Sequence, residues 1–270
     1  MSSPRVVFLG TGGALNPERY QASILVDGDP ARVLLDTGGG LGVVQRLLAA
    51  GVDPSGIGHV FLSHRHLDHA GGLEAFLLTL FHLAARAGRA PGPVRVYALA
   101  ETAAAVRATR AAADGAAERL LDGRLAWVSP APGAHVALED GLGLRLVSVD
   151  HPPPGGGAAG CVVELGSGRV AYSGDTRPSL DFAAAAAGAD LILHEVGGLD
   201  AKAGALHAIG HSTAGDAGRI ATRAGARALA LVHLPDSRSA APADLLAEAR
   251  RFAPGIEVVL AEDGMILPVA

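Results

Sequence analysis

Three histidines and one aspartate lie within residues 64–69, in the order His-Arg-His-Leu-Asp-His. Imidazole nitrogens and carboxylate oxygens together suit a borderline divalent metal ion, Zn first, with Mn and Fe as alternatives. Four donors this close in sequence cannot easily all bind one tetrahedral ion. If the chain turns between His66 and Asp68, we expect His64 and His66 to bind one ion and Asp68 and His69 a second. The alternative is a solvated polar loop whose histidines cluster by chance.

The elements on either side of this segment predict where its side chains lie. Residues 60–62 form a short apolar run that predicts a buried strand, and residues 73–87 carry apolar side chains at helical spacing. Gly71 and Gly72 lead from the segment into this helix. We therefore expect residues 64–69 to form a tight loop at the C-terminal end of a strand, the edge of an α/β sheet at which sites are built.

The same pattern recurs along the chain, where further polar side chains follow predicted strands. They are Asp36 after residues 33–35, His151 after 144–149, Asp175 after 169–172, Glu195 after 189–193 and His233 after 228–232. Taken alone, these residues also have ordinary structural explanations. Asp36 could cap a turn, and Asp175 could cap a helix that begins near Pro178.

The spacing His-x-His-x-Asp-His of residues 64–69 is the signature of the metallo-β-lactamase fold, a superfamily of mostly two-metal hydrolases. The chain resembles this superfamily from residues 8–13 to about residues 261–264, and it is most similar to the branch of RNase Z and related compact phosphodiesterases. The resemblance implies an α/β fold, a four-layer αβ/βα sandwich of two mixed β-sheets flanked by helices. It also implies a single hydrolase domain over residues 1–270, with metal ions at the seam between the sheets.

The resemblance completes two sets of metal ligands. His64, His66 and His151 would bind one ion, and Asp68, His69 and His233 the other, with Asp175 shared as a bridging ligand. Asp36 looks like the carboxylate that accepts the second ring N–H of a metal-binding histidine. The implied cofactors are two divalent metal ions, with Zn as the first choice and Mn or Fe as alternatives.

Two further motifs resemble the RNase Z branch, namely His194-Glu195 and the His-Ser-Thr string at residues 211–213. In that branch the second histidine is not a metal ligand but faces the scissile phosphate. Carried over to this chain, His211 would be the general acid and Glu195 would orient it. The rival assignments make His211 a metal ligand or a residue of the helix cap. Asp68 belongs to the catalytic set as well as to the metal-binding set.

This set of residues implies phosphodiester hydrolysis. Two metal ions about 3.5–4 Å apart clamp the attacking and leaving oxygens of a displacement and lower the pKa of a bridging water. The metal-bridging hydroxide would attack phosphorus in line, and His211 would protonate the departing alkoxide, a step worth roughly 10²–10⁴ in rate. Lactone hydrolysis would need this acid less, because the metals alone could hold the tetrahedral intermediate.

The expected substrate is a small phosphodiester of the cyclic nucleotide or cyclic ribosyl phosphate type. RNase Z enzymes typically carry a long Gly/Pro-rich arm that grips tRNA, whereas only 23 residues separate His151 from Asp175 here. Residues 234–238, after His233, also depart from the Phe-Ser-x-Arg-Tyr pattern expected of the tRNA enzyme. The net charge of −5 provides no basic field for nucleic acid. Three alternatives stay open: a tRNA 3′ endonuclease that lacks the arm, a carboxyl-ester, lactone or thioester hydrolase, and a metal-containing binding protein without turnover.

Composition and the length of apolar runs predict the state of the cysteine and the location of the protein. Cys161 is the only cysteine, which excludes a disulfide within the chain, and its apolar neighbours predict a buried thiol. No apolar run reaches ~18 residues and no secretory h-region precedes the first strand, so we expect a cytoplasmic protein that does not enter a membrane. Dimerisation is common in the family, which leaves a homodimer open.

The sequence pattern also predicts several further elements outside the candidate site. Residues 125–128, 135–138 and 144–149 are expected as strands of the second sheet, residues 101–119 as one or two helices, and the run from residue 196 to Gly210 as flexible.

Overall fold

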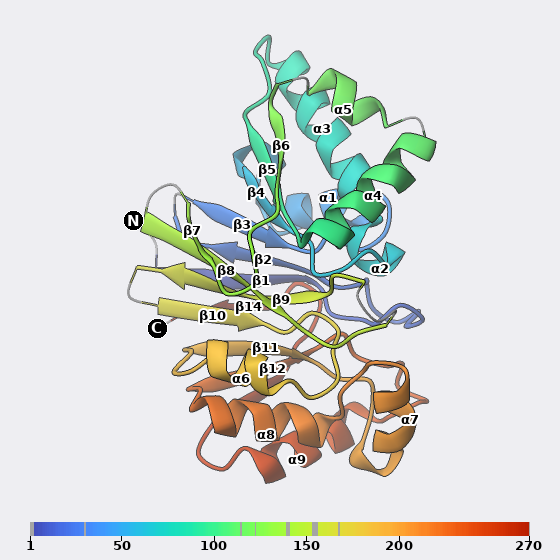
Figure 1. Ribbon diagram of the computed structural model, residues 1–270, viewed down its shortest axis with the longest axis vertical. Coiled ribbons are helices and arrows are strands. Elements are labelled where there is room, and N and C mark those ends of the chain that lie inside the picture. Colours follow the sequence, from blue (N-terminus) through green and yellow to red (C-terminus); the bar gives the residue numbers. More distant parts are fainter. Residues whose placement is uncertain are drawn as a thin grey trace.

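Two mixed β-sheets pack face to face in the computed structural model, which describes residues 3–29, 31–113, 115–121, 123–138, 141–152, 156–166 and 168–269 (Figure 1). The first sheet has the strand order β14 (Ile266–Pro268), β1 (Arg5–Gly10), β2 (Ser23–Asp27), β3 (Arg32–Leu35), β4 (His59–Phe61), β5 (Val94–Tyr97) and β6 (Leu125–Val128). The second has the order β13 (Glu257–Leu260), β12 (Ala228–Val232), β11 (Leu191–Glu195), β10 (Gly168–Tyr172), β9 (Ala159–Leu165), β8 (Leu142–Ser148) and β7 (His135–Ala137).

The two sheets have the same internal design. In the first, the strands from β14 to β3 pair antiparallel and those from β3 to β6 pair parallel. In the second, the strands from β13 to β10 pair parallel and those from β10 to β7 pair antiparallel. Parallel neighbours need long crossover connections, and helices supply most of these here.

Strand β1 shows how one apolar run serves two cores. Val6 and Phe8 belong to the core between the two sheets, whereas Val7 and Leu9 face the helices on the outer side of the first sheet. Successive side chains of a strand point to opposite faces, so a strand covered on both faces is apolar throughout. The fold therefore has one core between the sheets and one beneath each layer of helices.

Helices form the two outer layers (Figure 1). The helices that connect strands of the first sheet are α1 (Gly42–Ala49), α2 (Leu67–Ala70), α3 (Leu73–Arg86), α4 (Ala100–Ala112) and α5 (Ala116–Leu120). Those that connect strands of the second sheet are α6 (Leu180–Ala185), α7 (Ala203–Ala208), α8 (Ala214–Ala224) and α9 (Pro242–Phe252). The predicted four-layer αβ/βα sandwich is confirmed. Cys161 is a buried free thiol, as predicted. Within the described residues, no helix has the length and apolar character that a membrane crossing requires.

Two predictions about elements are wrong. Strand β6 does not belong to the second sheet, because α4 and α5 form a crossover that returns the chain to the first sheet, where β6 pairs parallel with β5. The run from residue 196 to Gly210, expected as flexible, contains regular structure, namely the 3₁₀ turn η3 (Asp200–Lys202) and helix α7. Helix α7 buries none of its residues, so its sequence shows no apolar stripe that would have revealed it.

Candidate metal centre

The polar residues singled out in the sequence gather at one edge of the two sheets, where strands end. The first sheet supplies Asp36 after β3 and the 64–69 segment after β4. The second supplies His151 after β8, Asp175 after β10, Glu195 at the end of β11 and His233 after β12. The seam between the sheets therefore brings together residues that are up to 197 positions apart, from Asp36 to His233.

The segment 64–69 is part loop and part helix, which separates its four side chains into two pairs. His66 is the last extended residue, with φ −63° and ψ 149°, and α2 begins at the next position. The backbone N–H and hydroxyl of Thr37 both donate to the carbonyl of His69, at 2.7 and 2.8 Å, and so fix this helix against the end of β3. The expected turn between His66 and Asp68 is present.

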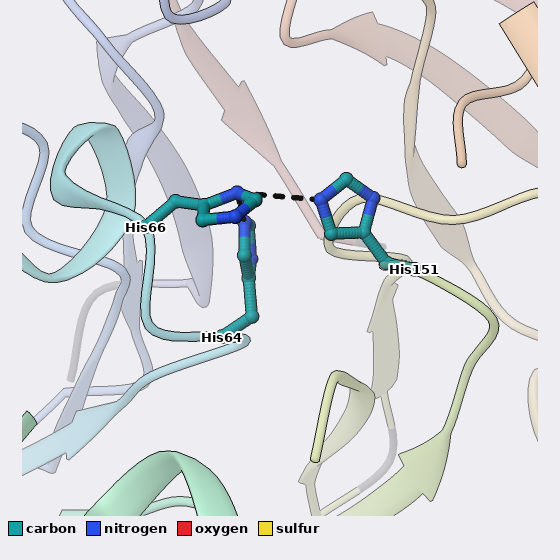
Figure 2. A group of neighbouring side chains, drawn as sticks. All are labelled: His64, His66 and His151. Atoms are coloured by element: carbon teal, nitrogen blue, oxygen red, sulfur yellow. Dashed lines mark hydrogen bonds between the residues drawn. The ribbon is translucent and has the colours of Figure 1, made fainter. Parts of the chain in front are cut away.

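The first group of ring nitrogens consists of His64, His66 and His151 (Figure 2). Nε2 of His64 lies 2.9 Å from Nδ1 of His66, and Nε2 of His151 lies 3.3 Å from that same Nδ1. The other nitrogen of His151, Nδ1, donates to the carbonyl oxygen of Gly210 at 2.9 Å. Because this bond fixes the proton on Nδ1, the lone pair of Nε2 points at the other two rings.

The protonated, positively charged form of the histidines is unfavourable in this first group. Burial first, and then the neighbouring His69, lower the pKa of His64 well below its ordinary value. Burial and the nearby His151 lower the pKa of His66 as well. The rings are therefore neutral near pH 7, which is the form of imidazole that binds a metal ion.

The second group consists of Asp68, His69, Asp175 and His233. Oδ2 of Asp175 lies 3.3 Å from Nε2 of His69 and 3.3 Å from Nε2 of His233. Oδ2 of Asp68 lies 3.3 and 3.4 Å from the same two nitrogens. Asp175 also reaches toward the first group, with Oδ2 3.8 Å from Nε2 of His64, and so stands between the two groups.

Asp36 anchors the second group from behind. Its carboxylate accepts the backbone N–H of Ser63 at 2.7 Å and the Ser63 hydroxyl at 2.6 Å. It also accepts Nδ1–H of His69 at 2.8 Å and the phenol O–H of Tyr172 at 2.8 Å. The expected hydrogen bond between Asp36 and a clustered histidine is therefore present, and the histidine is His69. Because Nδ1 of His69 is bound to Asp36, its Nε2 faces Asp68 and Asp175.

Backbone conformation at the site is strained in two places. Asp36 and His233 have φ of +55° and +52°, two of three described residues other than glycine with positive φ. Such conformations cost an L-residue energy and concentrate at functional sites. Gly174, with φ +56°, precedes Asp175, and a Cβ there would lie 2.8 Å from the Cβ of Ser63. Only glycine lets the two sheets approach this closely at the centre of the cluster.

His211 and Glu195 lie beside the two groups. Nδ1 of His211 is 3.1 Å from Oε1 of Glu195 and 4.0 Å from Oδ2 of Asp175. The same Oε1 accepts the backbone N–H of Thr176 and of Ser212, each at 3.0 Å. Burial lowers the pKa of His211, but the hydrogen bond and charge of Glu195 outweigh it and raise this pKa to about 9. In the metal-free protein this pKa favours the protonated form of His211 at neutral pH.

The buried donors fit bound divalent ions. Nε2 of His69 and Oδ1 of Asp175 are buried and have no hydrogen-bond partner among the described residues, although buried polar atoms normally have one. Histidine nitrogens with carboxylate oxygens are the donor set of zinc and related ions. A cation between the groups would use these unpaired atoms and would balance the carboxylates of Asp68 and Asp175.

Two cavities border the cluster. One of about 310 Å³ is lined by residues of both groups together with Ala14, Pro152, Ile209 and His211. A larger one, of about 510 Å³, lies across His151 and is bordered by Glu101 and Asp150. Of the clustered residues only His151 lines the larger cavity, so we assign the reacting group of a substrate to the smaller one.

Sequence reasoning missed several residues that support this site. Ser63 and Tyr172 hold the Asp36 carboxylate, and Thr176 links Asp175 to Glu195 through its backbone N–H. The positions of Ser63 and Thr176, each directly beside a candidate ligand, were the available signal. Tyr172 lies within an apolar strand and had no such signal. His194 and His207 lie outside the two groups.

The chain is similar in sequence to known proteins over nearly its whole length. Residues 31–234 match the family model of the Beta-lactamase superfamily domain. The Ribonuclease Z of Haloferax volcanii is 30% identical over an alignment of 323 positions, which covers 99% of this chain and 95% of that protein.

Two solved structures show the shared fold. The metallo-beta-lactamase fold protein YhfI from Bacillus subtilis has a TM-score of 0.77 and 22% identity, covering 98% of this chain and 100% of its own. The short form of human tRNase Z has a TM-score of 0.74 and 20% identity, covering 98% of this chain and 99% of its own.

The chain therefore belongs to the β-lactamase superfamily. Within it, the chain belongs to the branch that contains RNase Z and the compact phosphodiesterases, and it is a metal-dependent hydrolase.

Proposed function

We propose that this protein is a dinuclear phosphodiesterase that acts on a small phosphodiester. In this proposal two zinc ions occupy the cluster, one held by the first group of histidines and one by the second group, with Asp175 shared between them. When bound, the two ions supply Lewis-acid stabilisation and a nucleophilic oxygen at neutral pH. The support is the separation of the ligands into two adjacent sets around one carboxylate.

The chain itself supplies the proton for the leaving group. Glu195 occupies Nδ1 of His211, which leaves Nε2–H to face a departing alkoxide in the smaller cavity, whose lining includes His211. A carboxylate partner on Nδ1 favours the protonated imidazole that a general acid needs, and on this contact we prefer the acid over the rival ligand assignment. Asp68 would bind metal and help to hold His69 and His233 in place.

The single observation that carries the proposal is the contact of 3.1 Å between Nδ1 of His211 and Oε1 of Glu195. Glu195 is fully buried and is held by two backbone N–H groups, so the position of its carboxylate is fixed. A buried carboxylate that fixes a protonated histidine next to a metal cluster provides an acid that alkoxide departure requires. Lactone or thioester hydrolysis has less use for it.

A small substrate agrees with the length of the chain. The alignment with the haloarchaeal relative is 323 positions long and the chain has 270 residues, so at least 53 of the aligned positions (323 minus 270) are gaps in this chain. Between His151 and Asp175 the described residues form the antiparallel strands β9 and β10 with short connections. The described residues contain no long arm there that could grip a tRNA.

A tRNA 3′ endonuclease is the second candidate. The relative at 30% identity is named a Ribonuclease Z, and the alignment covers 95% of its length. In this case tRNA would bind without an arm of the expected kind.

The experiment compares substrate classes with zinc-loaded protein. The panel holds a cyclic nucleotide, bis(p-nitrophenyl) phosphate, a lactone, a thioester and a tRNA precursor with a 3′ trailer. We expect turnover of the two phosphodiesters to exceed that of the others. His211→Ala should lower kcat for the cyclic nucleotide by roughly 10²–10⁴.

His207→Ala is the matched control, because His207 lies in the same segment but binds Asp216, at 2.8 Å, rather than the cluster. This variant should keep the wild-type rate. Full occupancy by two metal ions without phosphodiester turnover would refute the proposal and point to lactones or thioesters. Cleavage of the tRNA precursor alone would establish the second candidate. A single domain over residues 1–270, a cytoplasmic location and a homodimer stay predictions.

A further inference from the structure

The segments that carry His151 and His211 lie directly against each other. Nδ1 of His151 donates to the carbonyl oxygen of Gly210, at 2.9 Å. Gly210 has φ +87°, and a Cβ there would lie 2.1 Å from Cδ of Pro152 and 2.9 Å from Nδ1 of His151. The distance between the candidate ligand and the candidate acid thus depends on how residues 207–211 pack on residues 150–152.

Arg177 joins these two segments from the outside. On one side its guanidinium donates to Oδ1 of Asp150 at 2.6 Å, and its backbone N–H donates to the Asp150 carbonyl at 3.0 Å. On the other side it donates to the carbonyl oxygens of His207 and, at 3.3 Å, Ala208. Those carbonyls end helix α7, where cationic side chains are favourable.

The turn that follows α7 carries His211. The backbone N–H groups of Ile209 and His211 both donate to the Leu206 carbonyl, at 3.1 and 2.9 Å, and that of Gly210 donates to His207 at 3.1 Å. The position of His211 is therefore set by the last turn of α7, which Arg177 holds.

The energy of the ion pair does not explain this arrangement. The Asp150 side chain is 66% exposed and that of Arg177 is 30% exposed, and exposed pairs contribute little to stability. The planar guanidinium instead reaches three oxygen atoms on two segments, a geometry that a lysine ammonium on a flexible stem cannot reproduce.

We infer that Arg177 is a positioning residue for His211, which it holds in register with His151 by joining Asp150 to the carboxyl end of α7. The inference rests on the proposed function, in which His211 protonates the leaving group. Loss of the Arg177 side chain then displaces the turn that carries the acid, while the backbone hydrogen bond from residue 177 to the Asp150 carbonyl still holds the segment that carries His151.

The test uses two phosphodiesters with different leaving groups. A p-nitrophenolate ion is stable at neutral pH and departs without a proton, whereas an alkoxide needs the acid. Arg177→Ala should lower kcat for the alkyl diester by about 10- to 100-fold, the scale of a misplacement near 1 Å, and should affect the p-nitrophenyl diester much less. Arg177→Lys should recover part of the loss.

Arg169→Ala is the matched control. Arg169 donates to the carbonyl oxygen of Ala187 after helix α6, at 2.8 Å, and is also partly exposed. It should leave the ratio of the two rates unchanged. Metal content and thermal stability of the Arg177 variants should match those of this control.

Hydrogen exchange of the metal-free protein tests the inference without any turnover. The amides of residues 209–211 should exchange faster in Arg177→Ala than in wild type and in Arg169→Ala. Unchanged exchange there, or an equal loss of rate for both diesters, would overturn the inference. If the wild type cleaves neither diester, the proposed function fails and the exchange result alone decides whether Arg177 holds this turn.

Discussion

The phenol O–H of Tyr172 donates a hydrogen bond of 2.8 Å to Oδ2 of Asp36, across the seam between the two sheets. Tyr172 ends β10 of the second sheet, and Asp36 follows β3 of the first. The same oxygen lies 2.8 Å from Nδ1 of His69. One buried carboxylate therefore links the packing of the two sheets to the orientation of a candidate metal ligand.

Tyr172→Phe should weaken both functions of this link. Removing a hydrogen bond to a buried charged group should lower the free energy of unfolding of the metal-free protein by about 1.5–3 kcal/mol. Because Asp36 orients His69, zinc affinity should fall about 10- to 100-fold. Urea unfolding and a competitive zinc titration measure the two effects.

Tyr97→Phe is the control for this prediction. Tyr97 is equally buried, and its hydroxyl lies 3.0 Å from Nδ1 of His59, outside the cluster. This variant should lose stability without losing zinc affinity. Equal zinc affinities in the two variants would show that Tyr172 has no influence on the site.

Gly174→Ala should destabilise the fold more than an ordinary glycine replacement. Gly225→Ala, at φ +63° and in open space, should cost about 1–2 kcal/mol for the left-handed backbone alone. At Gly174 the new Cβ would also lie 2.8 Å from Ser63 Cβ and 2.8 Å from the Ala159 carbonyl oxygen. This overlap should add about 1–3 kcal/mol to the loss. Equal losses in chemical denaturation would contradict the close approach of the two sheets.

Removing one ligand from either set should cost the protein one of its two zinc ions, and removing all metal should destabilise it. We expect two zinc ions per chain in wild type by elemental analysis, and about one in His151→Ala and in His233→Ala. A chelator should lower the melting temperature, since free zinc at ~1,000 times its Kd stabilises a protein by about 4 kcal/mol. A wild-type stoichiometry of one ion, or a melting temperature insensitive to the chelator, would argue against a dinuclear site.

Glu195→Gln should change the charge of His211 in the metal-free protein. Burial lowers the pKa of His211, and Glu195 raises it to about 9 in wild type. The amide keeps the size of the side chain but removes the negative charge, so His211 should lose its proton at a lower pH. An NMR titration measures this, with His211→Ala assigning the resonance. Identical pKa values of His211 in wild type and Glu195→Gln would show that Glu195 is not the group that raises this pKa.

Local sequence was sufficient for part of the site. The donors at residues 64–69 are close in sequence, and the change from loop to helix after His66 separates them as expected. His151, Asp175 and His233 could be placed in the two groups only through the family resemblance, because residues alone do not say which strand ends meet.

Contacts between the two sheets could not be predicted from the sequence. Tyr172 is part of an apolar strand, and its bond to Asp36 exists only because the two sheets pack face to face. The link from Arg177 to α7 was hidden for a similar reason, since α7 buries no residue and so shows no apolar stripe. The sheet assignment of β6 failed because a parallel crossover and a change of sheet have similar patterns.

The rate at which His211→Ala cleaves an alkyl phosphodiester, relative to a p-nitrophenyl phosphodiester, tests the central claim most directly. If His211 protonates the leaving group, the variant should lose roughly 10²–10⁴ in kcat on the alkyl diester and far less on the p-nitrophenyl diester, with two zinc ions still bound. A loss of equal size on both substrates, or no loss on the alkyl diester, would contradict the assignment of His211 as the general acid.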